Sequence, residues 1–230
     1  MVNYLQDFTD FLKKVPLDKY RAEYRPIKIV EMDLPKEIQA IALLYEVYWK
    51  EKKFVSFDEF YKRYLNEKKQ LLEEFRKKIR MCENCFYLGL PARIYRTWAS
   101  LITQIHGGYV AESVFGNNSI EMSEHLDHAG ADFRVSYKGK KINYQVKKET
   151  MSREVRTAKK GKVKIDGEFI DIKYNVPSGD YFTNPKKLNG EYKTPYLRFI
   201  EDKTLKRFDN GFVVFTEEAF LSMKKKLDSQ

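Results

Sequence analysis

The stretch "HAGADFRVSYKGKKINYQVKKE", residues 128–149, decides the fold class of this 230-residue chain. Within it, "DFRVSYKG" and "KINYQVKKE" alternate apolar and polar residues, and Lys138, Gly139 and Lys140 separate the two runs. A period of two is typical of half-buried strands, and a short turn containing glycine favours a hairpin. We therefore expect two adjacent antiparallel strands here.

Outward from the hairpin, the first half of the sequence has a helical pattern. It predicts helices over residues 35–51, 57–79 and 91–115. Ser56 and Glu59 form a capping box that marks the start of the second helix. Gly107 and Gly108 interrupt the third helix, which predicts a kink or the close approach of another backbone.

Downstream of the hairpin, "GEFIDIKYNV" predicts a further strand, and "GFVVF", residues 211–215, predicts a short strand buried on both faces. Thr216 is the expected N-cap of a last helix. The predicted fold class is α/β (α+β), with a mixed central β-sheet flanked by helices and a helical N-terminal half. We expect one domain, with a helical region over residues 1–90 and a core over residues 91–230.

The chain carries 43 Lys and Arg against 33 Asp and Glu, so its formal net charge is +10. Such an excess favours a polyanionic partner, first nucleic acid and second an anionic membrane surface, although a lysine-rich solubilising surface is the plainer alternative. No run approaches the ~20 apolar residues that span a bilayer, and the N-terminus lacks the apolar core of a signal peptide. We expect a cytoplasmic protein with no membrane partner.

Three polar residues of the hairpin are expected to converge. Gln145 and Lys147 share one face of the second strand, and Asp132 begins the neighbouring strand. An aspartate and an amide oxygen are hard ligands suited to Mg²⁺, and a lysine beside them can position a water and stabilise charge on a phosphate. This arrangement fits phosphodiester hydrolysis; the plainer alternative is an amphipathic hairpin with a solvated polar face.

Asp132 followed by Gln145, Val146 and Lys147 resembles the motif of the PD-(D/E)XK nucleases. Glu112, in "GYVAESVF", matches by position the glutamate that this superfamily carries on the preceding helix. The stretch is most similar to the type II restriction endonucleases, and among them to the small enzymes of thermophiles that cut CTAG. It departs from the motif at Gln145, where Asp or Glu is expected, and before Asp132, where alanine replaces proline.

The resemblance implies a restriction-endonuclease-like fold and a Mg²⁺-dependent, sequence-specific cleavage of double-stranded DNA. Asp132, Gln145 and Glu112 would hold the metal, and Lys147 would position the nucleophile. A homodimer would read a palindromic site, and a DNA methyltransferase would be linked in function. The alternatives are a structure-specific or repair nuclease of the same superfamily, a DNA-binding protein that has lost catalysis at Gln145, and a basic RNA-binding protein.

The basic excess is concentrated directly after the second strand, with eight Lys and Arg between Lys147 and Lys164. Arginine binds guanine bidentately and lysine neutralises phosphates. The expected DNA-binding residues are Lys148, Ser152, Arg153, Arg156, Lys159, Lys160 and Lys162. The loop "YNVPSGDYFTNPKK", residues 174–187, is a second candidate for groove contacts; a solvated loop is the plainer alternative for each segment.

Other candidate residues have weaker patterns. Cys82 and Cys85 form a single C-x₂-C, which predicts a buried thiol pair or a local disulfide rather than a four-ligand zinc site. His125 and His128 precede the motif acid and are either contacts to phosphate, proton carriers or ordinary loop histidines. Asp127 is set aside as the motif acid because "EHLDHAG" lacks strand alternation.

Overall fold

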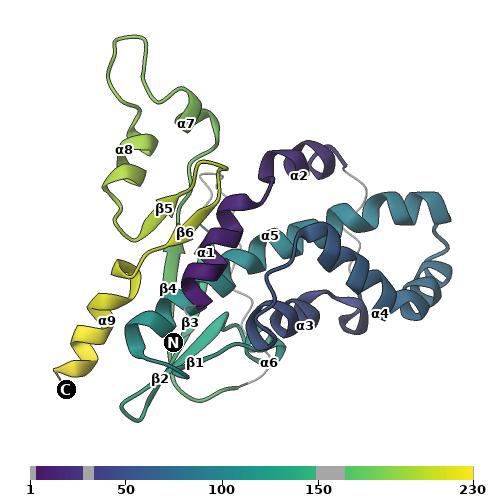
Figure 1. Cartoon of the computed structure of the whole chain (residues 1–230), viewed down its shortest axis with the longest axis horizontal. Helices are drawn as coiled ribbons and strands as arrows, with labels where there is room; N and C mark the ends of the chain where they lie inside the picture. Colours follow the sequence, from purple (N-terminus) through teal and green to yellow (C-terminus); the bar gives the residue numbers. More distant parts are fainter. Residues whose placement is uncertain (1–3, 28–33, 149–163, 230) are drawn as a thin grey trace. The chain divides into compact units, whose positions relative to one another are not determined.

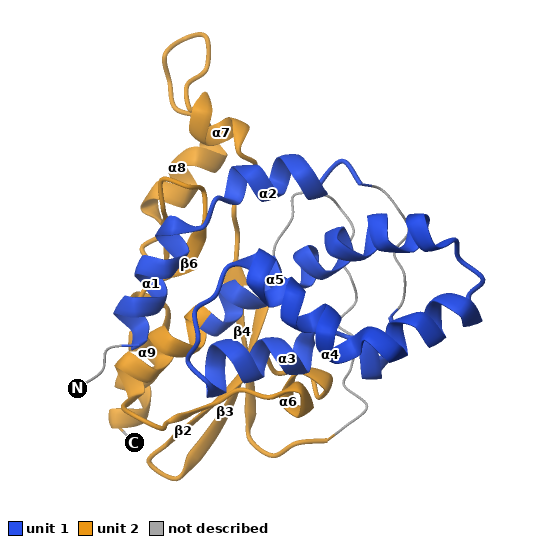
Figure 2. Ribbon diagram, turned by 45° about the vertical axis from the view of Figure 1, so that its right-hand side comes forward, with its two compact units in different colours: residues 1–105 blue, residues 106–230 orange. Residues whose placement is uncertain are grey.

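The computed structural model describes residues 4–27, 34–148 and 164–229. The chain divides into two compact units, Met1–Ile105 and His106–Gln230 (Figure 2). The division falls inside a long helix rather than near residue 90. The expectation of a single nuclease domain stays a prediction.

Unit 1 is helical, as the first half of the sequence predicts (Figure 1). Its elements are α1 (Tyr4–Lys14), α2 (Leu17–Tyr24), the 3₁₀-helix η1 (Lys36–Ile38), α3 (Ile41–Leu44), the π-helix η2 (Tyr45–Lys50), α4 (Phe57–Lys78) and most of α5 (Glu83–Phe115). The capping box of α4 is confirmed, because the Ser56 hydroxyl accepts from the Glu59 N–H at 3.2 Å and the Glu59 carboxylate accepts from the Ser56 N–H at 2.9 Å. These bonds satisfy backbone donors that a helix start leaves without partners.

Two helix predictions need correction. Residues 35–51 form three short helical pieces of different pitch instead of one helix. The helix predicted to begin at Pro91 begins at Glu83 and runs across the proline. The physical reason is packing: Phe86, Leu90 and Ile94 lie four residues apart and are all buried, so one apolar stripe continues through Pro91 and outweighs its helix-breaking tendency.

The core of unit 1 is built from large rings, and the polar atoms of three of them, Trp98, Tyr48 and Tyr64, have hydrogen-bond partners. The Trp98 indole N–H donates to the Tyr48 hydroxyl at 2.8 Å, and that hydroxyl donates to the Val55 carbonyl at 2.6 Å. Tyr64, also fully buried, donates to the Ile38 carbonyl at 2.7 Å. Buried aromatic rings contribute much apolar area, and hydrogen bonds remove the cost of burying their hydroxyl and N–H groups.

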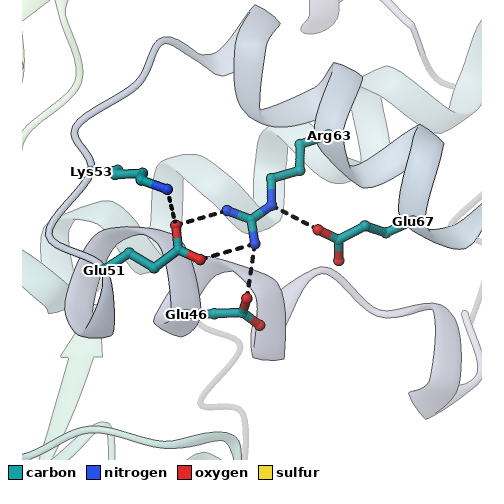
Figure 3. Close-up of polar contacts among 5 residues, drawn as sticks. All are labelled: Glu46, Glu51, Lys53, Arg63 and Glu67. Atoms are coloured by element: carbon teal, nitrogen blue, oxygen red, sulfur yellow. Dashed lines mark hydrogen bonds and ion pairs between the residues drawn. The ribbon is translucent and has the colours of Figure 1, made fainter.

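An ion-pair cluster centred on Arg63 connects η2 and the following turn to α4 (Figure 3). Its guanidinium contacts Glu46 at 2.8 Å, Glu51 at 2.9 Å and Glu67 at 2.7 Å, and Lys53 contacts Glu51 at 2.9 Å. The hydrogen bonds from Arg63, with those from Lys53, lower the pKa of Glu51 to about 2. We call these five residues the Arg63 cluster.

The two cysteines of unit 1 form a disulfide between Cys82 and Cys85, with their Cα atoms 5.3 Å apart. The prediction of a local disulfide is confirmed. The alternative of a buried thiol pair is wrong, because both residues are exposed at the start of α5.

Unit 2 contains a four-stranded mixed sheet of order β1-β2-β3-β4 (Figure 1). The strands are β1 (Ile120–Glu121), β2 (Phe133–Tyr137), β3 (Lys140–Lys148) and β4 (Glu168–Tyr174). The predicted hairpin is confirmed: β2 and β3 are antiparallel, and Lys138 and Gly139 turn the chain with positive φ angles of 46° and 75°. β4 pairs parallel to β3, which makes the sheet mixed.

The remaining elements of unit 2 are a two-stranded antiparallel sheet and helices. They are α6 (Glu124–His128), α7 (Asp180–Thr183), α8 (Thr194–Glu201), β5 (Leu205–Arg207), β6 (Val213–Phe215) and α9 (Glu218–Asp228). All three residues of β6 are buried, as predicted for "GFVVF". The predicted fold class, a mixed sheet flanked by helices with a helical N-terminal half, is confirmed.

Aromatic packing joins the sheet to its helices. Phe133 and Tyr144, from β2 and β3, stack at 5.1 Å, and Phe220 from α9 meets both rings edge-on. Gly107 lies close against the Phe215 ring: a Cβ there would lie 3.1 Å from the ring, so the ring would have to shift to make room for it. The expected close approach at the glycine pair is therefore made by a side chain, and α5 continues unbroken through it.

Two further expectations are corrected in unit 2. Thr216 does not cap α9; Glu217 precedes the helix, and the Thr216 hydroxyl donates to the Lys203 carbonyl instead. The plainer alternative of a solvated polar strand face is wrong at Asn143, which is fully buried and whose amide oxygen accepts from Arg134 at 2.9 Å. Pairing with a buried arginine satisfies the amide, so burial costs little there. In the described parts of the chain, no helix is both long and apolar enough to cross a bilayer.

Candidate active site

The register of the central sheet brings the candidate residues into one row. Phe133 pairs with Tyr144, and the Asp132 N–H donates to the Tyr144 carbonyl at 2.8 Å, so Asp132 lies beside Gln145 at the start of β2. On the other side of β3, Gln145 pairs with Asp171 of β4. Lys147, two residues further along β3, shares the face of Gln145. We call Asp132, Gln145, Asp171 and Lys147 the acid–lysine row.

Asp132 is held at the edge of this row by the backbone of β3. Its carboxylate accepts from the Val146 N–H at 2.5 Å. Burial raises the pKa of Asp132 to about 7; the Val146 hydrogen bond opposes this shift, and the nearby Asp127 charge adds to it. No Lys or Arg among the described residues forms an ion pair with Asp132. Its ionised form is therefore costly in the protein alone and would be favoured by a cation.

Lys147 has an ion-pair partner that the sequence pattern does not reveal. Its ammonium pairs with the Asp171 carboxylate at 2.5 Å. The only signal in the sequence was an acid within a strand-like run, "GEFIDIKYNV". The parallel register with β3, a property of the tertiary structure, places that acid opposite Gln145. Asp171 therefore supplies a negative charge on the strand that neighbours the uncharged Gln145.

Glu112 lies on α5, where its carboxylate accepts from the Asn118 N–H at 3.1 Å and closes the turn after the helix. Within the residues that the structure describes, no three Asp, Glu, His or Cys side chains cluster closely enough to hold a metal ion. The metal-binding roles of Asp132, Gln145 and Glu112 therefore stay predictions. Asp132 and Gln145 nevertheless have the ligand atoms that a hard divalent cation prefers, because they offer neighbouring oxygen ligands.

Asp127 belongs to the surroundings of the row although it lies on helix α6. Burial raises its pKa, and the His128 charge opposes that shift. His128 in turn lies 3.9 Å from Glu124, one helical turn away. Asp127 lies on a helix, as the lack of strand alternation in its segment indicates, and its charge still adds to the raised pKa of Asp132.

Most of the predicted DNA contacts lie outside the described residues. These are Ser152, Arg153, Arg156, Lys159, Lys160 and Lys162. Lys148 is the last residue of β3, and only its backbone is described. The prediction that this basic segment binds DNA therefore stays a prediction.

The chain as a whole resembles known restriction enzymes. The model of the TaqI restriction endonuclease family matches residues 5–227. The chain is 34% identical to the type II restriction enzyme TaqI of Thermus aquaticus, over 96% of this chain and 86% of that protein. It is 32% identical to the type II restriction enzyme TthHB8I of Thermus thermophilus, over 93% of this chain and 84% of that protein. No solved structure matches the chain significantly.

Proposed function

The chain belongs to the TaqI restriction endonuclease family, and we propose that the acid–lysine row is the centre at which this type II restriction endonuclease hydrolyses DNA. It is an endodeoxyribonuclease, and its substrate is DNA. The observation that carries the assignment of the row is the sheet register, which aligns Asp132, Gln145 and Asp171 across three strands beside Lys147.

Type II restriction enzymes generally use a divalent metal ion, and we propose Mg²⁺ for this chain. Asp132 and Gln145 would hold it, with Glu112 as the expected third ligand. The bound ion would polarise a phosphate oxygen and lower the pKa of a water molecule. Because Gln145 brings no charge, the carboxylate of Asp132 is the main electrostatic contribution of the pair.

The chain's own groups have separate tasks in this proposal. The Asp132 carboxyl must lose its proton before it binds a cation, and its raised pKa makes that step depend on pH near neutrality. The Lys147 ammonium orients the attacking water and stabilises the charge that develops on the phosphate. Asp171 holds that ammonium in place through their ion pair and is a positioning residue.

DNA recognition belongs to the same proposal. Lys148, Lys159, Lys160 and Lys162 would neutralise phosphates, and Ser152, Arg153 and Arg156 would contact base edges. A homodimer would place two such centres on a palindromic site, and a methyltransferase would protect the host's own copies of that site. The CTAG site expected from the resemblance stays a prediction.

A digest of a sequenced plasmid tests the proposal. We expect discrete fragments with Mg²⁺ and none with EDTA, and sequencing of the fragment ends gives the recognition site. Asp132→Ala should abolish cutting while most DNA binding remains, whereas the exposed Lys69→Ala on α4 should cut normally. Full activity of Asp132→Ala would remove the site assignment, and a smear instead of bands would indicate a nuclease that reads shape rather than sequence.

A further inference from the structure

The segment between α7 and α8 forms a short hairpin in unit 2 (Figure 1). Lys186 and Tyr192 pair as an antiparallel bridge, and the Lys187 N–H donates to the Glu191 carbonyl at 2.7 Å. Gly190 takes a positive φ of 84° at the turn, which suits glycine. We call residues 184–193 the finger. Its backbone is held together by its own hydrogen bonds, so the hairpin has a defined shape.

The base of the finger is fastened by aromatic contacts. Phe182 of α7 meets Phe199 of α8 edge-on at 5.0 Å, and Tyr192 stacks on Tyr196 at 5.4 Å. The Arg207 guanidinium lies 4.6 Å from the centre of the Phe182 ring. Such contacts restrict the finger to few orientations. Less conformational entropy of the finger is therefore lost when a ligand binds.

The tip of the finger carries a leucine whose side chain is not covered by any of the described residues. Leu188 is 111% exposed, the largest value among the exposed large apolar residues of the described chain. An exposed leucine alone is unremarkable. At the tip of an ordered hairpin, however, it presents its whole apolar surface to a partner.

The side chains around Leu188 suit a nucleic acid. Lys186, Lys187 and Lys193 outnumber the single acid Glu191, which is 3.2 Å from Lys187. Asn184 and Asn189 line the same open hollow as these lysines and Leu188. Cations favour phosphates, and asparagine amides can both donate to and accept from base edges.

We propose that the finger is a DNA-binding element in which Leu188 enters a base step of the duplex while its lysines contact the flanking phosphates. Apolar side chains that enter a base step unstack it and bend the duplex, and the new contacts offset the unstacking cost. The inference rests on the proposed function, because DNA is the substrate of the enzyme. It adds a second contact region, separate in sequence from the basic segment that follows β3.

Base unstacking is the direct test. Duplexes that carry 2-aminopurine at successive positions across the mapped cleavage site are titrated, in EDTA, with Asp132→Ala protein, which we expect to bind without cutting. We expect a fluorescence increase at one step, and its loss when Leu188→Ala is added to that protein. Leu88→Ala, which changes an exposed leucine of α5, is the matched control and should keep the signal.

Cleavage kinetics give a second readout. Leu188→Ala in the otherwise intact enzyme should raise KM about tenfold, since full burial of a leucine side chain is worth that much or more. Lys186→Ala and Lys187→Ala should each lower the slope of log affinity against log salt by about 1, and Lys69→Ala on α4 should not.

The outcomes separate this inference from the proposed function. If the unaltered enzyme cuts no DNA, the proposed function fails. If it cuts, but no probe position responds and Leu188→Ala keeps its KM, the finger proposal alone is overturned. A Leu188→Ala enzyme that changes from dimer to monomer while its DNA affinity is unchanged would likewise overturn it, because the finger would then bind a second copy of the chain.

Discussion

The Arg63 cluster and the acid–lysine row both contain acidic and basic side chains, but the pKa of a carboxyl group is lowered in the first and raised in the second. In the Arg63 cluster, one guanidinium contacts three carboxylates, and the pKa of Glu51 falls to about 2 (Figure 3). In the row, Asp132 is desolvated and receives a single backbone N–H bond, and its pKa rises to about 7. The charges of the Arg63 cluster are paired with one another, whereas in the row the ionised form of Asp132 needs a cationic ligand.

The chain has 76 formally charged Lys, Arg, Asp and Glu residues, 43 basic and 33 acidic. The difference between the two regions shows how to distinguish charged residues that stabilise the fold from charged residues that take part in catalysis. Charges that satisfy one another stabilise the native structure modestly and do not need a ligand. A buried acid without a cation costs free energy in the folded state, and such costs are common where a site binds ions or substrate. Changes in the row should therefore affect cutting, and changes in the cluster should affect stability.

After the complete loss expected for Asp132→Ala, the next largest effect follows from removing the cation of the row. Lys147→Ala should lower kcat by roughly 10²- to 10³-fold, the range found when one electrostatic group is removed from a transition-state site. Single-turnover cleavage of a plasmid at saturating enzyme measures this loss. Unchanged kcat would show that the row and the catalytic centre are different places.

A smaller loss should follow from weakening the partner of that cation. Asp171→Asn keeps an oxygen acceptor beside Lys147 but removes its charge, and we expect kcat to fall about tenfold while KM stays nearly constant. Asp171→Glu should recover part of the loss, and the exposed Asp209→Asn serves as the control. An equal rise of KM in both Asp171 variants, with kcat intact, would argue against a positioning role.

The raised pKa of Asp132 predicts how stability depends on pH in the metal-free protein. The folded state holds this proton more tightly than the unfolded chain, whose ordinary value is 3.8, so stability should fall as pH rises from about 4 to about 7 and then level off. Urea unfolding in EDTA between pH 4 and pH 8, compared with Asp132→Asn, isolates this contribution. If the unaltered protein instead became more stable relative to Asp132→Asn as the pH rose, the burial argument would be contradicted.

The same carboxyl should link metal binding to pH. Because Mg²⁺ competes with the Asp132 proton, its stabilising effect should be larger at pH 8 than at pH 5.5. Melting temperatures with and without Mg²⁺ at the two pH values measure this. In Asp132→Asn, the effect of pH on the Mg²⁺-induced shift should disappear.

The smallest effect is expected in the Arg63 cluster. Arg63→Ala should lower the free energy of unfolding by about 1 kcal/mol, because its partners are partly exposed and can be solvated. High salt should reduce the difference from the unaltered protein. Cleavage at a temperature well below unfolding should be unchanged; a strong loss of kcat would end the contrast between the two regions.

Local patterns in the sequence predict which helices and strands form better than they predict the residues at which these begin and end. The hairpin around Gly139 and the capping box at Ser56 both depend on residues within a few positions of one another. The predictions that a helix starts at Pro91 and that Thr216 caps the last helix were both wrong. The first is decided by the packing of a buried apolar stripe, and the second by a hydrogen bond from Thr216 to the Lys203 carbonyl.

By itself, the sequence determined the fold class, the strand faces and the pairing of Asp132 with the strand of Gln145 and Lys147, because alternation and a short turn act locally. Only the tertiary structure decided that Asp171 faces Gln145, that Asp127 on α6 raises the pKa of Asp132, and that Asn143 is buried with Arg134. Parallel pairing, burial and the electrostatic environment depend on residues far apart in the chain. No local pattern of residues encodes them.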